Sequence, residues 1–288
     1  GLLKALAHVI ADATKARVGY LSSGANGLGA CLAGAQPQSL PGGKPADAGG
    51  LSAAAMLAQP RKGYLVWGLE PGLDLGNPAQ AAKALGQADL VVACTAFRSP
   101  SLEAVADVLL PIAAFAETSG TFVNAEGAWQ GFRGAVAPPG EARPGWKVLR
   151  VLGNLLGLTG FDQTDSGELR EELRAQCTDA KLDNAPRGDL KALPLSSQQP
   201  VAQGIWRVGT VPIYAVDPLV RRAQALQASP LAVPFGVWLS PADASGLGLT
   251  VGDRVEVRQG GTAAQAQLSL DPSLPRGCVR IPAGVAGS

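Results

Sequence analysis

Residues 106–130 constrain the possible folds of this chain more than any other stretch, because their pattern predicts a strand, a loop, a second strand and a turn in succession. The apolar run over 108–112 is typical of a strand that helices cover on both faces, which predicts a place in the middle of an α/β sheet. Residues 117–121 then bring hydroxyl groups and a glycine to the carboxyl end of that strand. Open α/β sheets bind their ligands at this edge.

The second half of this stretch predicts a shaped turn. Residues 121–123 are β-branched or aromatic and predict a short strand. Asn124 and Gly127 stand first and fourth in the next four residues, as a type I turn prefers. We expect Gly120 to adopt a positive φ and Asn124 to close the turn through its own side chain.

Helices and strands alternate through the first 177 residues, which predicts parallel strand pairing with right-handed crossovers. The expected strands are 17–21, 63–68, 88–94 and 108–112. The expected helices are 1–16, which we expect to pack by one face, 51–57, 79–87 capped by Asn77 and Pro78, 143–156 and 164–177.

A glycine-rich loop over 22–29 follows the first expected strand and precedes a helix. Free backbone N–H groups and the helix dipole make such a loop a cradle for phosphate. Its spacing matches neither the dinucleotide-binding nor the P-loop pattern, and no Lys-Ser or Lys-Thr pair follows. A purely structural turn therefore stays open beside a phosphate cradle.

The pattern changes after Gly204 to short strands, expected at 212–214, 235–239, 254–257, 264–270 and 279–282. Residues 178–204 are polar and contain prolines, which predicts a linker. We therefore expect two consecutive domains, 1–177 and 205–288. Asp217 and Pro218 begin a helix that carries Arg221 and Arg222. A solvated basic face is favoured for these arginines over the docking of a partner's carboxylates.

Composition excludes several classes of function. Lys and Arg number 24 against 23 Asp and Glu, so the field that would attract nucleic acid or an anionic membrane is absent. Every apolar run ends well before the ~20 residues that a membrane helix needs. The chain begins at Gly1 without a methionine or a signal peptide, which favours a piece of a longer protein.

The sequence contains no recognisable catalytic or metal-binding motif. Four cysteines, Cys31, Cys94, Cys177 and Cys278, lie far apart without a C-x-x-C pair, which favours reduced, mostly buried thiols. His8 is the one histidine, and a surface or hydrogen-bonded role is favoured over a metal role. We expect no catalytic residue and no metal ligand in this chain.

The motif ADVLLP at 106–111, followed by SGTFVNAEG at 119–127, closely resembles the molybdopterin oxidoreductase superfamily. In detail it resembles the large iron–sulfur subunit, or G-type chain, of proton-translocating NADH:quinone oxidoreductase, respiratory complex I. The resemblance extends to 138–157 and 211–227, and residues 239–257 resemble the superfamily's carboxyl-terminal double-psi β-barrel. One position departs from the pattern: Ala128 stands where the family usually has an arginine.

This resemblance implies an α/β fold with a parallel Rossmann-like sheet domain followed by a double-psi β-barrel-like domain. It implies a cofactor-free scaffold part of a subunit that passes electrons from NADH to quinone through iron–sulfur clusters outside this chain. The implied partners are other peripheral-arm subunits of complex I, without nucleic acid or direct membrane insertion. The implied location is cytoplasmic, peripheral to the inner membrane. A relict cofactor pocket would comprise Gly24, Asn26, Gly27, Glu117, Gly120, Thr121, Asn124 and Glu126.

An alternative is the carboxyl half of a molybdopterin-dinucleotide-dependent oxidoreductase, such as a formate dehydrogenase. In that case the same loops would hold the cofactor. Ala128 counts against this alternative, because a cation that would grip an anionic cofactor is missing there. The sequence upstream of Gly1 would decide, since cluster-type cysteine spacings there would favour the iron–sulfur subunit.

Overall fold

The computed structural model describes residues 2–22, 24–183, 204–259 and 261–287. Contacts between residues divide the chain into two compact units that interleave along the sequence. Unit 1 combines 1–55 with 112–200, and unit 2 combines 56–111 with 201–288. The two domains expected from the sequence are consecutive, and their boundaries stay a prediction. Most of the expected linker, residues 184–203, lies outside the described residues.

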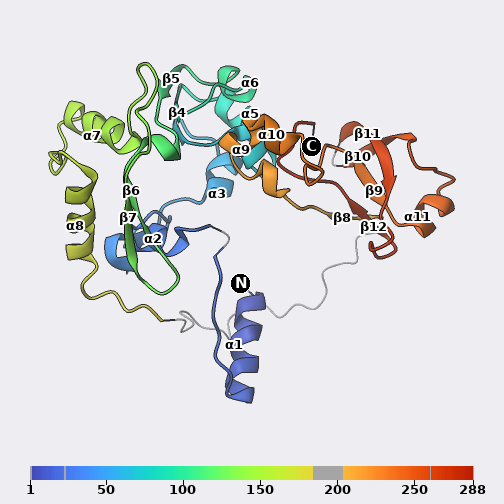
Figure 1. The fold of residues 1–288 in the computed structure, drawn as a ribbon, viewed down its shortest axis with the longest axis horizontal. Coiled ribbons are helices and arrows are strands. Elements are labelled where there is room, and N and C mark those ends of the chain that lie inside the picture. Colours follow the sequence, from blue (N-terminus) through green and yellow to red (C-terminus); the bar gives the residue numbers. More distant parts are fainter. Residues whose placement is uncertain (1, 23, 184–203, 260, 288) are drawn as a thin grey trace. The chain divides into compact units, whose positions relative to one another are not determined.

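Unit 1 holds an antiparallel ribbon of two strands together with several helices (Figure 1). Its elements are α1 (Leu2–Thr14), α2 (Gly27–Leu32), β1 (Ser39–Leu40), η1 (Pro41–Gly43), β2 (Lys44–Pro45), η2 (Phe115–Glu117), β6 (Gly120–Val123), β7 (Trp129–Phe132), α7 (Gly145–Leu155) and α8 (Ser166–Gln176). Strands β6 and β7 pair from Gly120 with Phe132 to Val123 with Trp129. The helices expected over 1–16, 143–156 and 164–177 are therefore confirmed.

The amino-terminal part of unit 1 differs from the expectation in two ways. Helix α1 buries Ala5 and Ala11 but leaves Leu3 83% exposed, so the expected packing of its apolar face is wrong. The strand expected over 17–21 is also wrong, because no described strand pairs with these residues and Leu21 is 97% exposed. His8 lies 2.5 Å from the Tyr20 hydroxyl, which agrees with a hydrogen-bonded histidine.

Unit 2 contains a parallel sheet in the order β3-β4-β5 (Figure 1). The strands are β3 (Gly63–Trp67), β4 (Leu90–Thr95) and β5 (Val108–Pro111), and the helices between them are α4 (Pro71–Asp74), α5 (Pro78–Gly86) and α6 (Pro100–Glu103). Helix α3 (Ala53–Ala58) precedes β3. Asn77 caps α5 by accepting the Gln80 amide at 3.0 Å.

One face of this parallel sheet forms a hydrophobic core. The buried residues of the core are Val66, Leu85, Val91, Ala93 and Leu102. Strand β5 lies at the edge of the sheet and Val108 is 42% exposed, so the expected place in the middle of the sheet is wrong. A run of apolar residues alone does not distinguish an edge strand from a central one.

The second sheet of unit 2 has five strands in the order β10-β11-β9-β12-β8, with parallel and antiparallel pairs. Its strands are β8 (Trp206–Val208), β9 (Val237–Leu239), β10 (Arg254–Gln259), β11 (Thr262–Leu270) and β12 (Cys278–Arg280). The helices of this part are η4 (Ile213–Ala215), α9 (Pro218–Arg222), α10 (Gln224–Gln227) and α11 (Pro241–Gly246). The core of this sheet includes Val237, Leu239, Leu268 and Val279.

The sequence prediction and this second sheet agree except near β8. Residues 212–214 form the start of the short helix η4 instead of the expected strand, because the Ala215 amide bonds back to the Pro212 carbonyl at 2.8 Å. Strand β8 was not expected. The α/β class is confirmed by a parallel sheet with crossover helices and a separate β-rich sheet of mixed pairing.

Candidate functional site

The two loops predicted to form a cofactor pocket, residues 24–29 and 117–127, lie together in unit 1; we call them the signature loops. The Asn26 side-chain oxygen accepts the Val123 backbone amide at 2.8 Å, which joins the first loop to strand β6. Helix α2 begins at Gly27, directly after Asn26. The expected cradle of strand, loop and helix is incomplete, because the strand before the loop does not form.

The turn between β6 and β7 forms as the sequence predicted. The Asn124 side-chain oxygen accepts the amides of Glu126 at 3.0 Å and Ala128 at 2.9 Å. The Gly127 amide donates to the Asn124 carbonyl at 3.0 Å, and Gly127 takes a φ of 85°. Asn124 therefore closes the turn through its own side chain, and Gly127 supplies the left-handed residue.

Gly120 is constrained by a neighbouring ring, not by its backbone angle. The expectation of a positive φ is wrong, because Gly120 is absent from the glycines that adopt one in the described part of the chain. A Cβ added at this position would lie 2.8 Å from Cζ of Phe132. Phe132 stacks edge-on against Phe122 with ring centroids 5.1 Å apart. The close approach of this ring explains why a glycine stands here.

The remaining predicted residues take part in local structure. A Glu117 carboxylate oxygen accepts the Ala114 amide at 2.9 Å and so closes η2. The Gly24 carbonyl accepts the Ser22 hydroxyl at 2.7 Å. Thr121 pairs with Gly131 in the ribbon, and Glu126 is exposed. The structure thus brings Asn26 to strand β6 and leaves Glu126 facing solvent.

A hollow of about 760 Å³ lies beside the signature loops. Ser119, Thr121 and Ser166 line it with hydroxyl groups, and Arg133 and Arg170 line it with cations. The Ser166 hydroxyl donates to the Ser119 hydroxyl at 2.9 Å, which ties the start of α8 to the loop. Arg170 also forms an ion pair with Glu171 at 2.8 Å.

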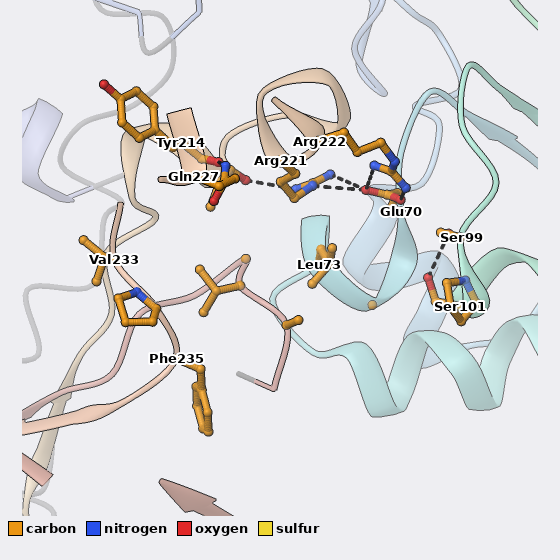
Figure 2. Close-up of a pocket in the computed structure, with 17 residues that line it drawn as sticks. Glu70, Leu73, Ser99, Ser101, Tyr214, Arg221, Arg222, Gln227, Val233 and Phe235 are labelled. Carbon is orange, nitrogen blue, oxygen red and sulfur yellow. Dashed lines mark hydrogen bonds and ion pairs between the residues drawn. The ribbon is translucent and has the colours of Figure 1, made fainter. Parts of the chain in front are cut away.

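A buried ionic cluster forms a second candidate site, within unit 2 (Figure 2). Glu70 follows strand β3 and begins α4, and its side chain is 2% exposed. Arg222 contacts Glu70 at 2.6 Å, and Arg221 contacts it at 2.9 Å. Arg221 also contacts Asp74 at 2.8 Å. We call these four residues the Glu70 cluster.

Arg221 is the most enclosed cation of this cluster, with a side chain that is 10% exposed. Its guanidinium also donates to the Ala215 carbonyl at 2.9 Å. Burial lowers the pKa of Arg221, but the hydrogen bonds and charges of Asp74 and Glu70 outweigh burial and raise the pKa above its ordinary value. Arg221 is therefore fixed as a cation.

Arg222 completes the cluster from the same helix, α9. It donates to the carbonyls of Arg98 and Pro218 at 3.1 Å each, and its guanidinium lies 4.7 Å from the Phe97 ring centroid. The solvated basic face that the sequence favoured is therefore wrong, since both arginines bind the buried carboxylate of Glu70 in the same unit. Glu70 is not among the site residues predicted from the sequence; a charged residue three positions after a buried strand is the signal that could have found it.

The described residues contain no group of three or more His, Cys, Asp or Glu side chains placed to hold a metal ion. All four cysteines are free thiols, and only Cys94 is buried, so the expectation of mostly buried thiols holds for one. Burial raises the pKa of the Cys94 thiol, which keeps it protonated near neutral pH. Within the described residues, no helix has the length and apolar character needed to cross a membrane.

Comparison with known families gives two matches. Residues 12–155 match the family described as molybdopterin oxidoreductase. Residues 222–287 match the family described as molydopterin dinucleotide binding domain. Among solved structures, acetylene hydratase from Pelobacter acetylenicus matches with a TM-score of 0.57 and 19% identity, over 82% of this chain and 40% of that one. This last similarity concerns the fold.

Curated relatives include subunits of NADH oxidoreductases and a nitrate reductase. The G-type subunit of the NADH-quinone oxidoreductase of Streptomyces coelicolor is 35% identical over 150 residues, covering 44% of this chain and 17% of the relative. The mitochondrial NADH-ubiquinone oxidoreductase 78 kDa subunit of Neurospora crassa is 42% identical over 69 residues, covering 24% and 9%. A nitrate reductase of Shewanella frigidimarina is 30% identical over 134 residues, covering 45% and 14%. The chain spans less than a fifth of the length of each.

The resemblance to the large subunit of the NADH:quinone oxidoreductases is thus confirmed, and it raises the question of whether the signature loops fit a molybdopterin. They do not. The space beside Gly120 is filled by Phe132, and a Cβ at Gly27 would lie 2.7 Å from Cβ of Ser22. The side-chain oxygens of Asn26 and Asn124 accept backbone amides of the loops themselves. Ala128 offers no cation. The cations nearest these loops, Arg133 and Arg170, line the hollow beside them instead.

Proposed function

Because the chain belongs to the molybdopterin oxidoreductase family, which matches residues 12–155 and so half of its 288 residues, we propose that it is a scaffold region of that fold without its cofactor. The parent would be the large iron–sulfur subunit of a proton-translocating NADH:quinone oxidoreductase. In that parent, electrons pass from NADH to quinone through iron–sulfur clusters outside this chain. The relatives named as NADH-quinone oxidoreductase subunits support this choice.

One observation carries the proposal: the signature loops use their polar groups on each other. The Asn26 side chain binds Val123, and the Asn124 side chain binds its own turn. In a cofactor-binding loop such groups would pair with the ligand, because a buried donor or acceptor without a partner costs about 1–3 kcal/mol. In this chain Asn26, Glu117 and Asn124 serve the loops themselves, whereas Thr121 lines the neighbouring hollow and Glu126 faces solvent.

The partners and the location follow from this role. We propose that the chain contacts other peripheral-arm subunits of the complex and lies on the cytoplasmic side of the inner membrane, without entering it. Nucleic acid is not a proposed partner, because positive and negative residues are almost equal in number, 24 against 23. The catalytic work of the parent, NADH oxidation and quinone reduction, would be done elsewhere.

The proposal is tested by the content of the purified chain. We expect no stoichiometric iron, molybdenum or pterin by elemental analysis and by fluorescence of the oxidised pterin, with a known molybdopterin enzyme purified in parallel as the control. A visible absorption band or one molybdenum per chain after desalting would contradict the proposal.

A second candidate is the carboxyl half of a molybdopterin-dinucleotide-dependent oxidoreductase. The similarity to a nitrate reductase favours it, and so does the hollow lined by Arg133 and Arg170. If this candidate holds, Arg133→Ala with Arg170→Ala lowers the molybdenum and pterin content of the chain. If the scaffold role holds, the double variant and the wild type are equally free of both.

A further inference from the structure

A cavity of about 650 Å³ lies within unit 2, beside the Glu70 cluster (Figure 2). Glu70 follows strand β3, and Ser99 and Ser101 follow strand β4, so one wall stands at the carboxyl ends of two parallel strands. Open α/β sheets bind ligands at this edge, and sites for small molecules measure about 300–1,000 Å³. Place and size therefore agree with a binding site that is separate from the signature loops.

The charged wall of this cavity is closed to charged ligands. Two carboxylates face two guanidinium groups, so the formal charges of the Glu70 cluster cancel. Arg221 uses both ends of its fork, on Glu70 and on Asp74, and Arg222 divides its donors between Glu70 and two carbonyls. A phosphate would have to displace a buried carboxylate from two arginines, which breaks a buried pair at large cost.

The other walls are mainly apolar. Leu73, Val233, Pro234, Phe235 and Val285 line the cavity, and Ser99, Ser101, Tyr214 and Gln227 add polar side chains. In Figure 2 the Val233 and Phe235 side chains lie across the cavity from Glu70 and Ser101. A ligand here would meet apolar surface on one side and a hydroxyl group on the other.

We propose that this cavity binds an uncharged, mainly apolar group, such as an aromatic ring that carries a hydrogen-bonding atom. Such a group buries apolar surface against Val233 and Phe235, and it needs no ionic contact with the neutralised Glu70 cluster. Its source is either a free small molecule or a side chain of a partner protein. Both sources present the same chemistry to the cavity.

The test uses three probes on the 288-residue chain: indole, p-cresol and inorganic pyrophosphate. We expect indole and p-cresol to give saturation-transfer NMR signals and pyrophosphate to give none. Val233→Trp fills the cavity and should weaken indole at least about tenfold, since a side chain of that size takes much of the ligand's space. Val136→Trp, at an exposed position in unit 1, is the matched control and should bind indole as the wild type does.

Val285→Phe serves as a second filling variant from another wall, so that poor folding of Val233→Trp does not leave the question open. Pyrophosphate binding without indole binding overturns the proposal, and so does indole binding that both filling variants leave unchanged. Native mass spectrometry then separates the sources. A bound mass on the wild type that Val233→Trp lacks indicates a free molecule. If the wild type carries no bound mass, and less multi-subunit complex is recovered with Val233→Trp than with the wild type, the ligand is a side chain of a partner protein.

Discussion

The signature loops of unit 1 and the Glu70 cluster of unit 2 are built in opposite ways. The loops carry the sequence motif, and apart from the bonds between Asn26 and Val123 and between Ser119 and Ser166, their side-chain contacts join residues at most four apart. The Glu70 cluster carries no motif, yet it joins residues 147 to 152 positions apart around the buried Glu70 carboxylate. A motif therefore marks ancestry here, while the strongest polar contacts lie where the sequence gives no pattern.

Cutting the chain between 179 and 203 is the largest change that sharpens this comparison. That segment is polar and contains prolines, so mild protease should cut there first. Because unit 2 combines 56–111 with 201–288, we expect the two fragments to elute together in gel filtration and to separate only in denaturant. Fragments that separate without denaturant would support the consecutive domains 1–177 and 205–288 instead. First cuts inside 88–130 would contradict both.

Glu70→Ala tests the cluster directly. It leaves the enclosed Arg221 and the half-buried Arg222 without their shared carboxylate, and breaking a buried ion pair costs about 3–5 kcal/mol of unfolding free energy. Urea denaturation measures this loss. Glu126→Ala removes an exposed carboxylate from the turn of unit 1 and should change stability by less than about 0.5 kcal/mol. Equal losses in the two variants would remove the contrast between the regions.

Particular elements show how far the sequence could predict this structure. The helix start at Asn77 and the turn at Asn124 were predictable, because the groups that stabilise them lie within four residues. The absence of a strand at 17–21 and the edge position of β5 were not, because both depend on which strands lie alongside. Periodicity reports which side chains are apolar, and it does not report what covers them.

The candidate sites divide in the same way. The hydrogen bond between Asn26 and Val123 joins residues 97 positions apart, and the sequence of neither loop predicts it. Gly120 was correctly singled out but for the wrong physical reason, since a ring and not a backbone angle requires it. Arg221 and Arg222 were noticed as a pair of charges, while Glu70, their partner in unit 2, was not predicted. A local motif does not identify which distant residues its side chains will contact.

Gly120→Val is expected to have an intermediate effect. The new side chain must displace the Phe132 ring, and overpacking of this kind costs about 1–3 kcal/mol. We expect a lower melting temperature and less assembled complex, while the complex that forms transfers electrons at an unchanged rate per cluster. Gly19→Val, where a Cβ meets nothing within 4 Å, is the control. A stable, fully assembled Gly120→Val complex without electron transfer would favour the cofactor-binding alternative.

Asp271 in unit 2 gives the smallest expected effect and tests a carboxylate held by local contacts instead of distant ones. Its side chain accepts the Ser273 hydroxyl at 2.6 Å and the Ser273 amide at 2.9 Å. These bonds, with a smaller contribution from Arg280, lower the pKa of Asp271 below its ordinary value. A carboxyl group whose pKa is lower in the folded state adds stability above its unfolded pKa of ~3.9 and loses it as the pH falls through the folded value. We therefore expect Asp271→Asn to lower the melting temperature slightly at about pH 6, and we expect the difference from the wild type to be smaller at about pH 2.5. A difference that stays constant between these two pH values would show that the charge of Asp271 contributes nothing.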